Sequence, residues 1–356
     1  MAYYNAKGEP WRYKGAVDVG DCTTSAEVIE KAGLDWYVDK CELYAKMQVN
    51  IENDYDLDKV IQETKDKDAH LHGKDIFRNC PNAFATYRTD YNIPLGVVKG
   101  KYTPVQNKEA FTFFDDAIGS GKAIWQTAGS FGNGERIFVS AKLPNNILVK
   151  GDPVDNYLVF TNTHDGSSGV KILFTPIRVI CRNTLTAAIR TSTNYVSFRH
   201  TASVHSNIQL AHEILGICDV RRKEIEQVYN MLAEIKVTDE DVMEFIGKNV
   251  LSPNEEEVLF ETGHNYKELC YRNNSAYEDS GISMRKLNVL SATWDYYNRG
   301  VGQKEIMGTA WGAVNAITGY YSNVDNAKDE KRFDSLVFGD KSRKIQTAFA
   351  MAEEFN

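Results

Sequence analysis

The side chains best suited to chemistry in this sequence stand together in one turn. His164 and Asp165 are neighbours and precede Gly166. A histidine beside a carboxylate can ligate a metal ion or act as a general base, but either role needs further side chains from elsewhere in the chain. His200 is the histidine that we add to this group. The candidate catalytic residues are therefore His164, Asp165 and His200.

The same turn also has a purely structural explanation. In an Asp-Gly turn the aspartate accepts backbone N–H bonds and the glycine supplies a positive φ. Two further histidines, His205 and His212, are seven residues apart, which exceeds the spacing that usually chelates one ion. Cys181 could act as a nucleophile with His164 or His200 as its base, or could simply be buried in an apolar strand. We expect no metal and no cofactor.

A second group of side chains is suited to binding an anion. Between residues 157 and 211 the only acid is Asp165, although the whole chain has a formal charge of −8. Segregated positive charge can form an anion-binding surface on an acidic protein. Arg178 and Arg182 would share one face of a strand, and Asn183 would start a helix whose free N–H groups favour an anion. The expected nucleic-acid- or anion-binding residues are Lys171, Arg178, Arg182, Arg190 and Arg199.

The alternative for these basic residues is that the fold brings carboxylates from elsewhere to pair with them. Three aromatic residues near them could stack on unpaired bases, or could be buried against the helical half of the chain. These aromatic residues are Tyr157, Tyr195 and Phe198.

The elements that must position these side chains form an antiparallel sheet followed by helices. Alternating apolar residues predict strands over 124–130, 136–143, 157–163 and 170–181, with a further short strand over 196–199. Asn133 and Gly134 predict the first hairpin turn. Beyond residue 206 the chain is acidic and has helical spacing. We therefore expect an α+β fold, with a central antiparallel β-meander and its helices, followed by a mostly helical C-terminal region.

We expect three regions along the chain. Residues 1–95 are a mixed α/β region, and residues 96–205 hold the central sheet and the candidate site. Residues 206–356 are helical, and they either form a separate region or one continuous domain with the sheet. Within them we expect a strand over 34–38, a loop over 70–74 and one long helix over 304–321. In that helix, small residues recur every four positions and predict a face for close helix contact. These small residues are Gly308, Gly312 and Ala316.

Composition limits the class of protein. Hydrophobic residues make up 42% of the chain and charged residues 25%, as in an ordinary globular protein. No apolar run approaches the roughly 20 residues that cross a bilayer, and the N-terminus does not have the pattern of a secretory signal. The six cysteines are spread out without a Cys-x-x-Cys pair, which favours a reducing compartment over a disulfide framework. We expect a cytoplasmic protein without a membrane partner.

Several segments match a known pattern, in order along the chain. These segments are Ala32–Trp36, Tyr102–Asn107, Thr127–Ser130, Thr161–Ser168, Thr175–Leu185, Gly308–Ala316 and Ser335–Gly339. The pattern resembles a family of unknown function that is common in bacteriophages and plasmids. The resemblance implies a mobile-element origin and brings no catalytic residues. Arg182 departs from the pattern, in which a small polar residue such as Asn is expected.

Three functional hypotheses follow. The first is a phage- or plasmid-encoded accessory protein that is not an enzyme. It would bind or anneal single-stranded DNA during recombination or replication, as a homo-oligomer in the bacterial cytoplasm. The second is a hydrolase or nuclease with a phosphate-bearing substrate, acting in counter-defence. The third is an inhibitor that binds a host protein through the acidic helical region. Net acidity counts against the first hypothesis, and the local excess of arginine supports it.

Overall fold

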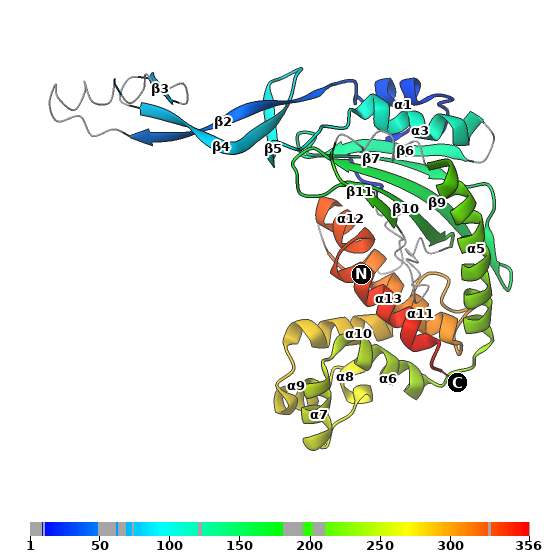
Figure 1. The fold of residues 1–356 in the computed structure, drawn as a ribbon. Helices are drawn as coiled ribbons and strands as arrows, with labels where there is room; N and C mark the ends of the chain where they lie inside the picture. The colour runs from blue at the N-terminus through cyan, green and yellow to red at the C-terminus, as the bar shows by residue number, and fades with distance from the viewer. Residues whose placement is uncertain are drawn as a thin grey trace.

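Two antiparallel sheets and a helical C-terminal region make up the protein, which confirms the predicted α+β class (Figure 1). The computed structural model describes residues 9, 11–48, 62, 69–72, 75–119, 123–180, 195–201, 211–326 and 329–355. None of the helices in these ranges is both long and apolar enough to cross a membrane.

The main sheet has the strand order β1-β6-β7-β9-β10-β11, with β8 paired to β9. Its strands are β1 (Val17–Asp18), β6 (Ile124–Phe131), β7 (Arg136–Lys142), β8 (Ile147–Val149), β9 (Asp152–Thr163), β10 (Val170–Arg178) and β11 (Tyr195–Phe198). The strands β6, β7, β9, β10 and β11 confirm the meander that the alternating pattern predicts. Gly134 has a φ of 117°, as expected for the turn between β6 and β7.

The second sheet forms an arm that projects from the main sheet (Figure 1). It contains β2 (Val38–Gln48), β3 (Ala69–His72), β4 (Asp75–Arg88) and β5 (Ile93–Lys99). Two predictions here were wrong. The strand expected over 34–38 begins only at Val38, and the loop expected over 70–74 contains β3, because pairing with β4 overrides its weak strand propensity. The expected boundary at residues 95–96 falls inside β5.

The loop between β9 and β10 attaches this arm to the main sheet. The Thr86 hydroxyl of β4 donates to the His164 carbonyl oxygen at 2.6 Å. Gly96 of β5 lies so close to Asp165 that a Cβ on Gly96 would stand 2.4 Å from the Asp165 backbone oxygen. The absence of a side chain at Gly96 therefore permits the contact between the arm and this loop.

Helices cover both faces of the main sheet. The helices are α1 (Ser25–Lys31), α3 (Asn107–Gly119), α5 (Ala211–Glu234), α6 (Asp239–Val250), α7 (Pro253–Glu261), α8 (Tyr266–Cys270), α9 (Asn274–Ser280), α10 (Met284–Arg299), α11 (Ala310–Gly319), α12 (Asp329–Val337) and α13 (Asp340–Ala352), with a π-helical turn η1 (Tyr320–Val324). The helices α1 and α3 lie over one face of the sheet, and α12 lies against the other (Figure 1).

Local capping explains where the helices begin. Thr238 and Asp241 form a capping box at the start of α6. The long helix expected from Lys304 was wrong, since α11 begins only at Ala310. Gly308 has a φ of 72° and Thr309 caps the helix by accepting from Gly312 N–H, so Gly308 lies in a turn rather than on a helix face.

One hydrophobic core connects the sheet to the C-terminal helices, since Trp125, Phe160 and Trp311 belong to the same buried cluster. A second, smaller cluster lies between the sheet and α12. Within it, the Phe333 ring of α12 packs against Phe131 and Phe138 at centroid distances of 5.2 and 5.8 Å. This aromatic contact fixes α12 over β7, and thereby positions the neighbours of Phe333 over the sheet.

Candidate anion-binding site

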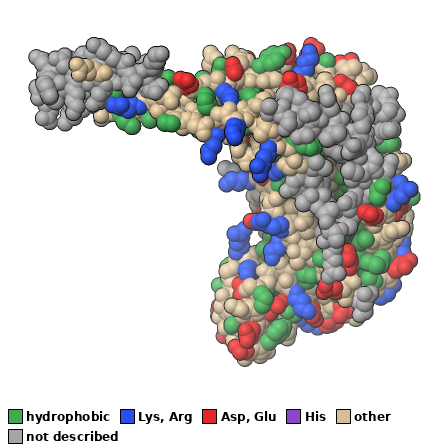
Figure 2. Space-filling view, viewed as in Figure 1, with side chains coloured by type: hydrophobic (Ala, Val, Ile, Leu, Met, Phe, Trp, Pro, Cys, Tyr) green, Lys and Arg blue, Asp and Glu red, His purple; other side chains and the backbone are tan. Residues whose placement is uncertain are grey.

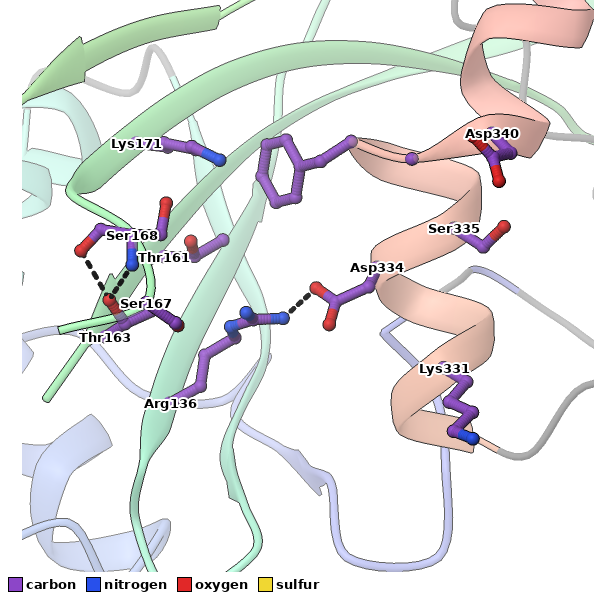
Figure 3. Close-up of a pocket in the computed structure, with 12 residues that line it drawn as sticks. Arg136, Thr161, Thr163, Ser167, Ser168, Lys171, Lys331, Asp334, Ser335 and Asp340 are labelled. Carbon is purple, nitrogen blue, oxygen red and sulfur yellow. Dashed lines mark hydrogen bonds and ion pairs between the residues drawn. The ribbon is translucent and has the colours of Figure 1, made fainter. Parts of the chain in front are cut away.

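A pocket of about 450 Å³ lies between the main sheet and the C-terminal helices α12 and α13. Strands β7, β9 and β10 form one wall, and the end of α12 with the start of α13 forms the other (Figure 3). Its size is in the range of pockets that hold small ligands or one unit of a polymer.

The register of the sheet brings the residues of the first wall together. Arg136 of β7 is paired with Thr163 of β9, and Lys171 of β10 is paired with Thr161 of β9. Directly paired residues point to the same face, and so do residues two apart on one strand. The two cations and the two hydroxyls therefore share the face that looks toward α12.

The loop after β9 contributes further hydroxyl groups. Ser167 and Ser168 line the pocket, and the Thr163 hydroxyl donates to the Ser168 carbonyl oxygen at 2.6 Å. The Ser168 N–H donates back to the Thr163 hydroxyl oxygen at 3.1 Å. This pair of hydrogen bonds holds the loop at the mouth of the pocket (Figure 3).

The helical wall contributes a carboxylate that pairs with Arg136, and a helix start. Asp334 of α12, next to Phe333, forms an ion pair with Arg136 across the pocket (Figure 3). Helix α13 begins at Asp340, and its N-cap residue Gly339 provides no side-chain hydrogen bond to the first turn. Backbone N–H groups at such a helix start favour a negatively charged ligand. The 13-residue length of α13 gives this end a full helix dipole.

The electrostatics of Lys171 favour an anion. Burial lowers the pKa of the Lys171 ammonium, and the like charge of Arg136 lowers it further. The Lys171 Nζ atom lies 4.2 Å from the centroid of the Phe338 ring. An anion bound near Lys171 would compensate both the burial and the repulsion, which gives the pocket a physical preference for negative charge.

Two of the sequence segments that carry the family resemblance meet in this pocket. Thr161–Ser168 provides four of its lining residues, and Ser335–Gly339 provides three, although the segments are more than 160 residues apart. Lys171 was predicted as an anion-binding residue, and it lines the pocket. Arg136 and Lys331 were missed, because the sequence does not reveal which residue of β7 stands opposite Thr163 or where α12 docks.

Arg178 was predicted to bind an anion, but it adopts the alternative, in which a carboxylate from elsewhere pairs with it. Its side chain is 0% exposed, and its guanidinium forms an ion pair with Asp152 and donates to the Gly302 carbonyl oxygen at 2.9 Å. Lys171 and Arg178 are an odd number of residues apart on β10, so they point to opposite faces. The partner Asp152 stands at the start of β9, just outside the acid-poor stretch that begins at residue 157.

The remaining residues of the predicted basic and aromatic groups differ in their exposure to solvent. Arg199 is exposed just after β11. Tyr157 is 2% exposed in the core beside α12, which is the burial alternative given for it rather than the stacking one. Phe198 is half-buried and packs against the main core. Arg182, Arg190 and the side chain of Tyr195 lie outside the described residues.

The three candidate catalytic residues do not line the pocket. His164 is 0% exposed and its Nε2 atom is 3.0 Å from Asn107 Oδ1 under α3, since it follows Thr163 by one residue and points to the opposite face. His200 is 6% exposed and stacks on Tyr102 at 4.5 Å. Burial, the larger cause in each case, lowers the pKa of His164 to about 3 and that of His200 to about 4.

The turn at His164 is an ordinary Asp-Gly turn. Asp165 accepts the Ser167 N–H at 2.8 Å, and Gly166 has a φ of 78°. Among the described residues, no group of three or more His, Cys, Asp or Glu side chains is arranged to hold a metal ion. The pocket at Lys171, rather than this turn, is therefore the candidate site.

The sequence matches the model of the family described as Domain of unknown function (DUF932) over residues 94–337. This range includes β5 from its second residue, the main sheet from β6 to β11, and α12. No curated protein and no solved structure matches the sequence.

Proposed function

We propose that this chain, which belongs to the DUF932 family, binds the phosphate backbone of single-stranded nucleic acid in the pocket between β10 and α12. In this proposal it is an accessory protein rather than an enzyme, encoded by a bacteriophage or plasmid. It would act as a homo-oligomer during recombination or replication in the bacterial cytoplasm. The observation that carries the proposal is the meeting of Arg136 and Lys171 with hydroxyl groups at the start of α13.

The pocket has the donors that a phosphate group requires. Phosphate oxygens accept hydrogen bonds from guanidinium and ammonium groups, from hydroxyls and from backbone N–H groups at a helix start. Arg136, Lys171 and Lys331 bring three positive charges, against two carboxylates on Asp334 and Asp340. The Asp334 carboxylate is already paired with Arg136, and the Asp340 carboxylate with Arg343. The Phe338 ring adds an aromatic surface on which a base could stack.

The surroundings of the pocket support a polymer rather than a small ligand. Figure 2 shows Lys and Arg side chains gathered along the inner side of the molecule, where the arm β2–β5 and the helical region face each other. A basic surface on a chain of net charge −8 favours a local polyanion contact over indiscriminate binding. The hydrolase or nuclease alternative has less support in the described residues, because His164 and His200 are buried outside the pocket.

The arm supports the expected oligomer. Among the described residues, β2 is an edge strand that pairs only with β4. An edge strand presents backbone N–H and C=O groups that can pair with a second chain. Met47 on β2 is 48% exposed, which adds an apolar side chain to this edge.

The proposal is tested by titrating a labelled oligothymidylate with the protein at low and moderate salt, using fluorescence anisotropy. We expect salt-dependent binding that Lys171→Ala weakens by about tenfold, with a shallower salt slope because one phosphate contact is lost. Lys171→Arg should retain most of the affinity. Lys223→Ala on the exposed side of α5 is the matched control for loss of one positive charge. Absence of binding at low salt, or equal effects of the two alanine variants, would contradict the proposal.

A further inference from the structure

A second pocket, of about 580 Å³, lies within the helical region. It is formed by the turn between α8 and α9 and by the second half of α10. It shares no lining residue with the pocket at Lys171. The residues that give it its chemical character are Tyr271, Arg272, Trp294, Asp295, Asn298 and Arg299.

Arg272 occupies a backbone position that favours glycine. Helix α8 ends with Arg272 N–H donating to Leu269 O at 3.0 Å and Asn273 N–H donating to Glu268 O at 2.8 Å. This is the Schellman arrangement, in which the residue at the place of Arg272 adopts a left-handed conformation and is usually glycine. Arg272 has a φ of 61°, so the chain holds an arginine where its side chain is a disadvantage for folding. Strain of this kind is frequent at functional sites.

The cationic groups of this pocket are available to a ligand. Within the described part of the chain, the Arg272 guanidinium has neither a carboxylate nor a hydrogen-bond partner. Arg299, in the last turn of α10, has a side chain that is 68% exposed, and its Nη1 atom forms an ion pair with Asp295 Oδ1 at 3.3 Å. Two guanidinium groups therefore line the same pocket, and one of them is not neutralised by any described side chain.

An aromatic side chain stands beside these cations. Tyr271 is 60% exposed, and its ring makes an edge-on contact with Trp294. The two ring centroids are 6.1 Å apart, and the ring planes are inclined at 73°. Trp294 is itself stacked on the buried Tyr297 at 5.4 Å, so the support behind Tyr271 is rigid. An exposed, supported ring next to guanidinium groups is suited to stacking on a planar base.

We propose that this pocket binds a nucleotide unit, with the base against Tyr271 and the phosphate at Arg272 and Arg299. Asn298 and Asp295 line the same pocket and add polar side chains to it, and the volume suits one nucleotide. The ligand chemistry is shared by a free mononucleotide and by a nucleotide at the end of a strand. This inference does not rest on the function proposed for the Lys171 pocket.

The experiment is calorimetric titration of the full chain with adenosine 5′-monophosphate, adenosine and ribose 5-phosphate. We expect the mononucleotide to bind more tightly than either part, by about tenfold, because stacking and phosphate pairing both contribute. Tyr271→Ala should lower the mononucleotide affinity by about tenfold, and Tyr271→Phe should retain it. Equal affinity for the mononucleotide and ribose 5-phosphate would overturn the proposal.

Arg272→Gly separates binding from folding. It removes the guanidinium and also relieves the left-handed backbone, so we expect a thermal midpoint that is unchanged or higher together with about tenfold weaker mononucleotide binding. Lys150→Gly is the matched control, since Lys150 has a φ of 48° and lies outside the pocket. It should raise stability without changing affinity. Equal affinities for Arg272→Gly and the parent chain would also overturn the proposal.

A short oligothymidylate serves as the second probe and identifies the source of the nucleotide. If Arg272→Gly weakens the mononucleotide alone, the pocket takes a free nucleotide. If it weakens both probes, the pocket takes a nucleotide unit of a strand. Both results support a nucleotide site at Arg272.

Discussion

Arg178 forms an ion pair with Asp152, which lies 26 residues before it in the chain and on the neighbouring strand. Trp311 of α11 also donates its indole N–H toward the same Asp152 oxygen at 3.4 Å. The pair therefore connects the end of β10 and the start of β9 to the helical region.

Removing one partner of this ion pair should destabilise the fold. Asp152→Ala leaves the guanidinium of Arg178 buried without its carboxylate, and we expect the free energy of unfolding to fall by about 3–5 kcal/mol. Combining it with Arg178→Met should recover part of that loss, because the buried charge is then absent. Urea denaturation of the parent chain, both single variants and the double variant measures the coupling. Strictly additive losses would show that the two residues do not interact.

Acid should destabilise the protein through its two buried histidines. The folded-state pKa values of His164 and His200 are about 3 and about 4, below the ordinary value of 6.5. The unfolded chain therefore binds protons below pH 6.5 that the folded chain does not. As the pH is lowered from 6.5, the free energy of unfolding decreases until each folded-state pKa is reached. Near pH 5 we expect a loss of about 2 kcal/mol for each histidine.

The contribution of one histidine can be isolated by substitution. In His200→Gln the loss of stability between pH 7 and pH 5 should be smaller than in the parent chain by about 2 kcal/mol. His264→Gln is the control, since His264 pairs with Asp279 and Glu268, and these carboxylates raise its pKa. Urea denaturation at pH 7, 6 and 5 provides the measurement. An identical pH dependence for the parent chain and His200→Gln would contradict this prediction.

Removing the carboxylate of Asp334 should strengthen anion binding. Asp334→Asn removes the ion pair between Asp334 and Arg136 and takes one negative charge from the pocket. We expect the affinity for a labelled oligothymidylate at low salt to rise by about fivefold, which corresponds to about 1 kcal/mol. Glu257→Gln on the exposed part of α7 makes the same change of net charge away from the pocket and should have little effect. A similar gain in both variants would indicate a general charge effect instead.

Adding a methyl group at Gly96 should separate the arm from the loop at Asp165. A Cβ there would meet backbone atoms at 2.4 Å, which cannot be relieved by moving a side chain. We expect Gly96→Ala to lower the free energy of unfolding by about 1–3 kcal/mol. Gly20→Ala is the milder comparison, because a Cβ there would meet the flexible Asp18 side chain at 3.2 Å. Equal stability of the two variants would argue against the close contact.

Much of the main sheet could be predicted from the alternation of apolar and polar residues and from the turn residues, because those signals act within a few residues of sequence. The beginning of α11 could not, since Lys304 to Met307 carry helix-forming residues and only Gly308 with Thr309 stops the helix from starting earlier. The arm strand β3 was missed because its pairing with β4 decides its structure.

The candidate site was predicted only in part. Lys171 was predicted from local charge. Arg136 lines the pocket because of the strand register, and Lys331 lines it because Phe333 docks α12 on the sheet. The prediction for Arg178 was wrong, although the sequence contained the information that corrects it. An interval of seven residues along one strand assigns Lys171 and Arg178 to opposite faces, and only one of those faces has the pocket.

The loop from His164 to Gly169 borders the Lys171 pocket through Ser167 and Ser168, and it supports the root of the arm through Asp165. A chain from which the arm had been deleted would lose the contacts of Thr86 and Gly96 behind that loop. Weaker ligand binding by such a truncated chain would then reflect a collapsed pocket wall as much as a missing arm. Point substitutions on β2, which leave the root intact, are the sounder way to learn what the arm touches.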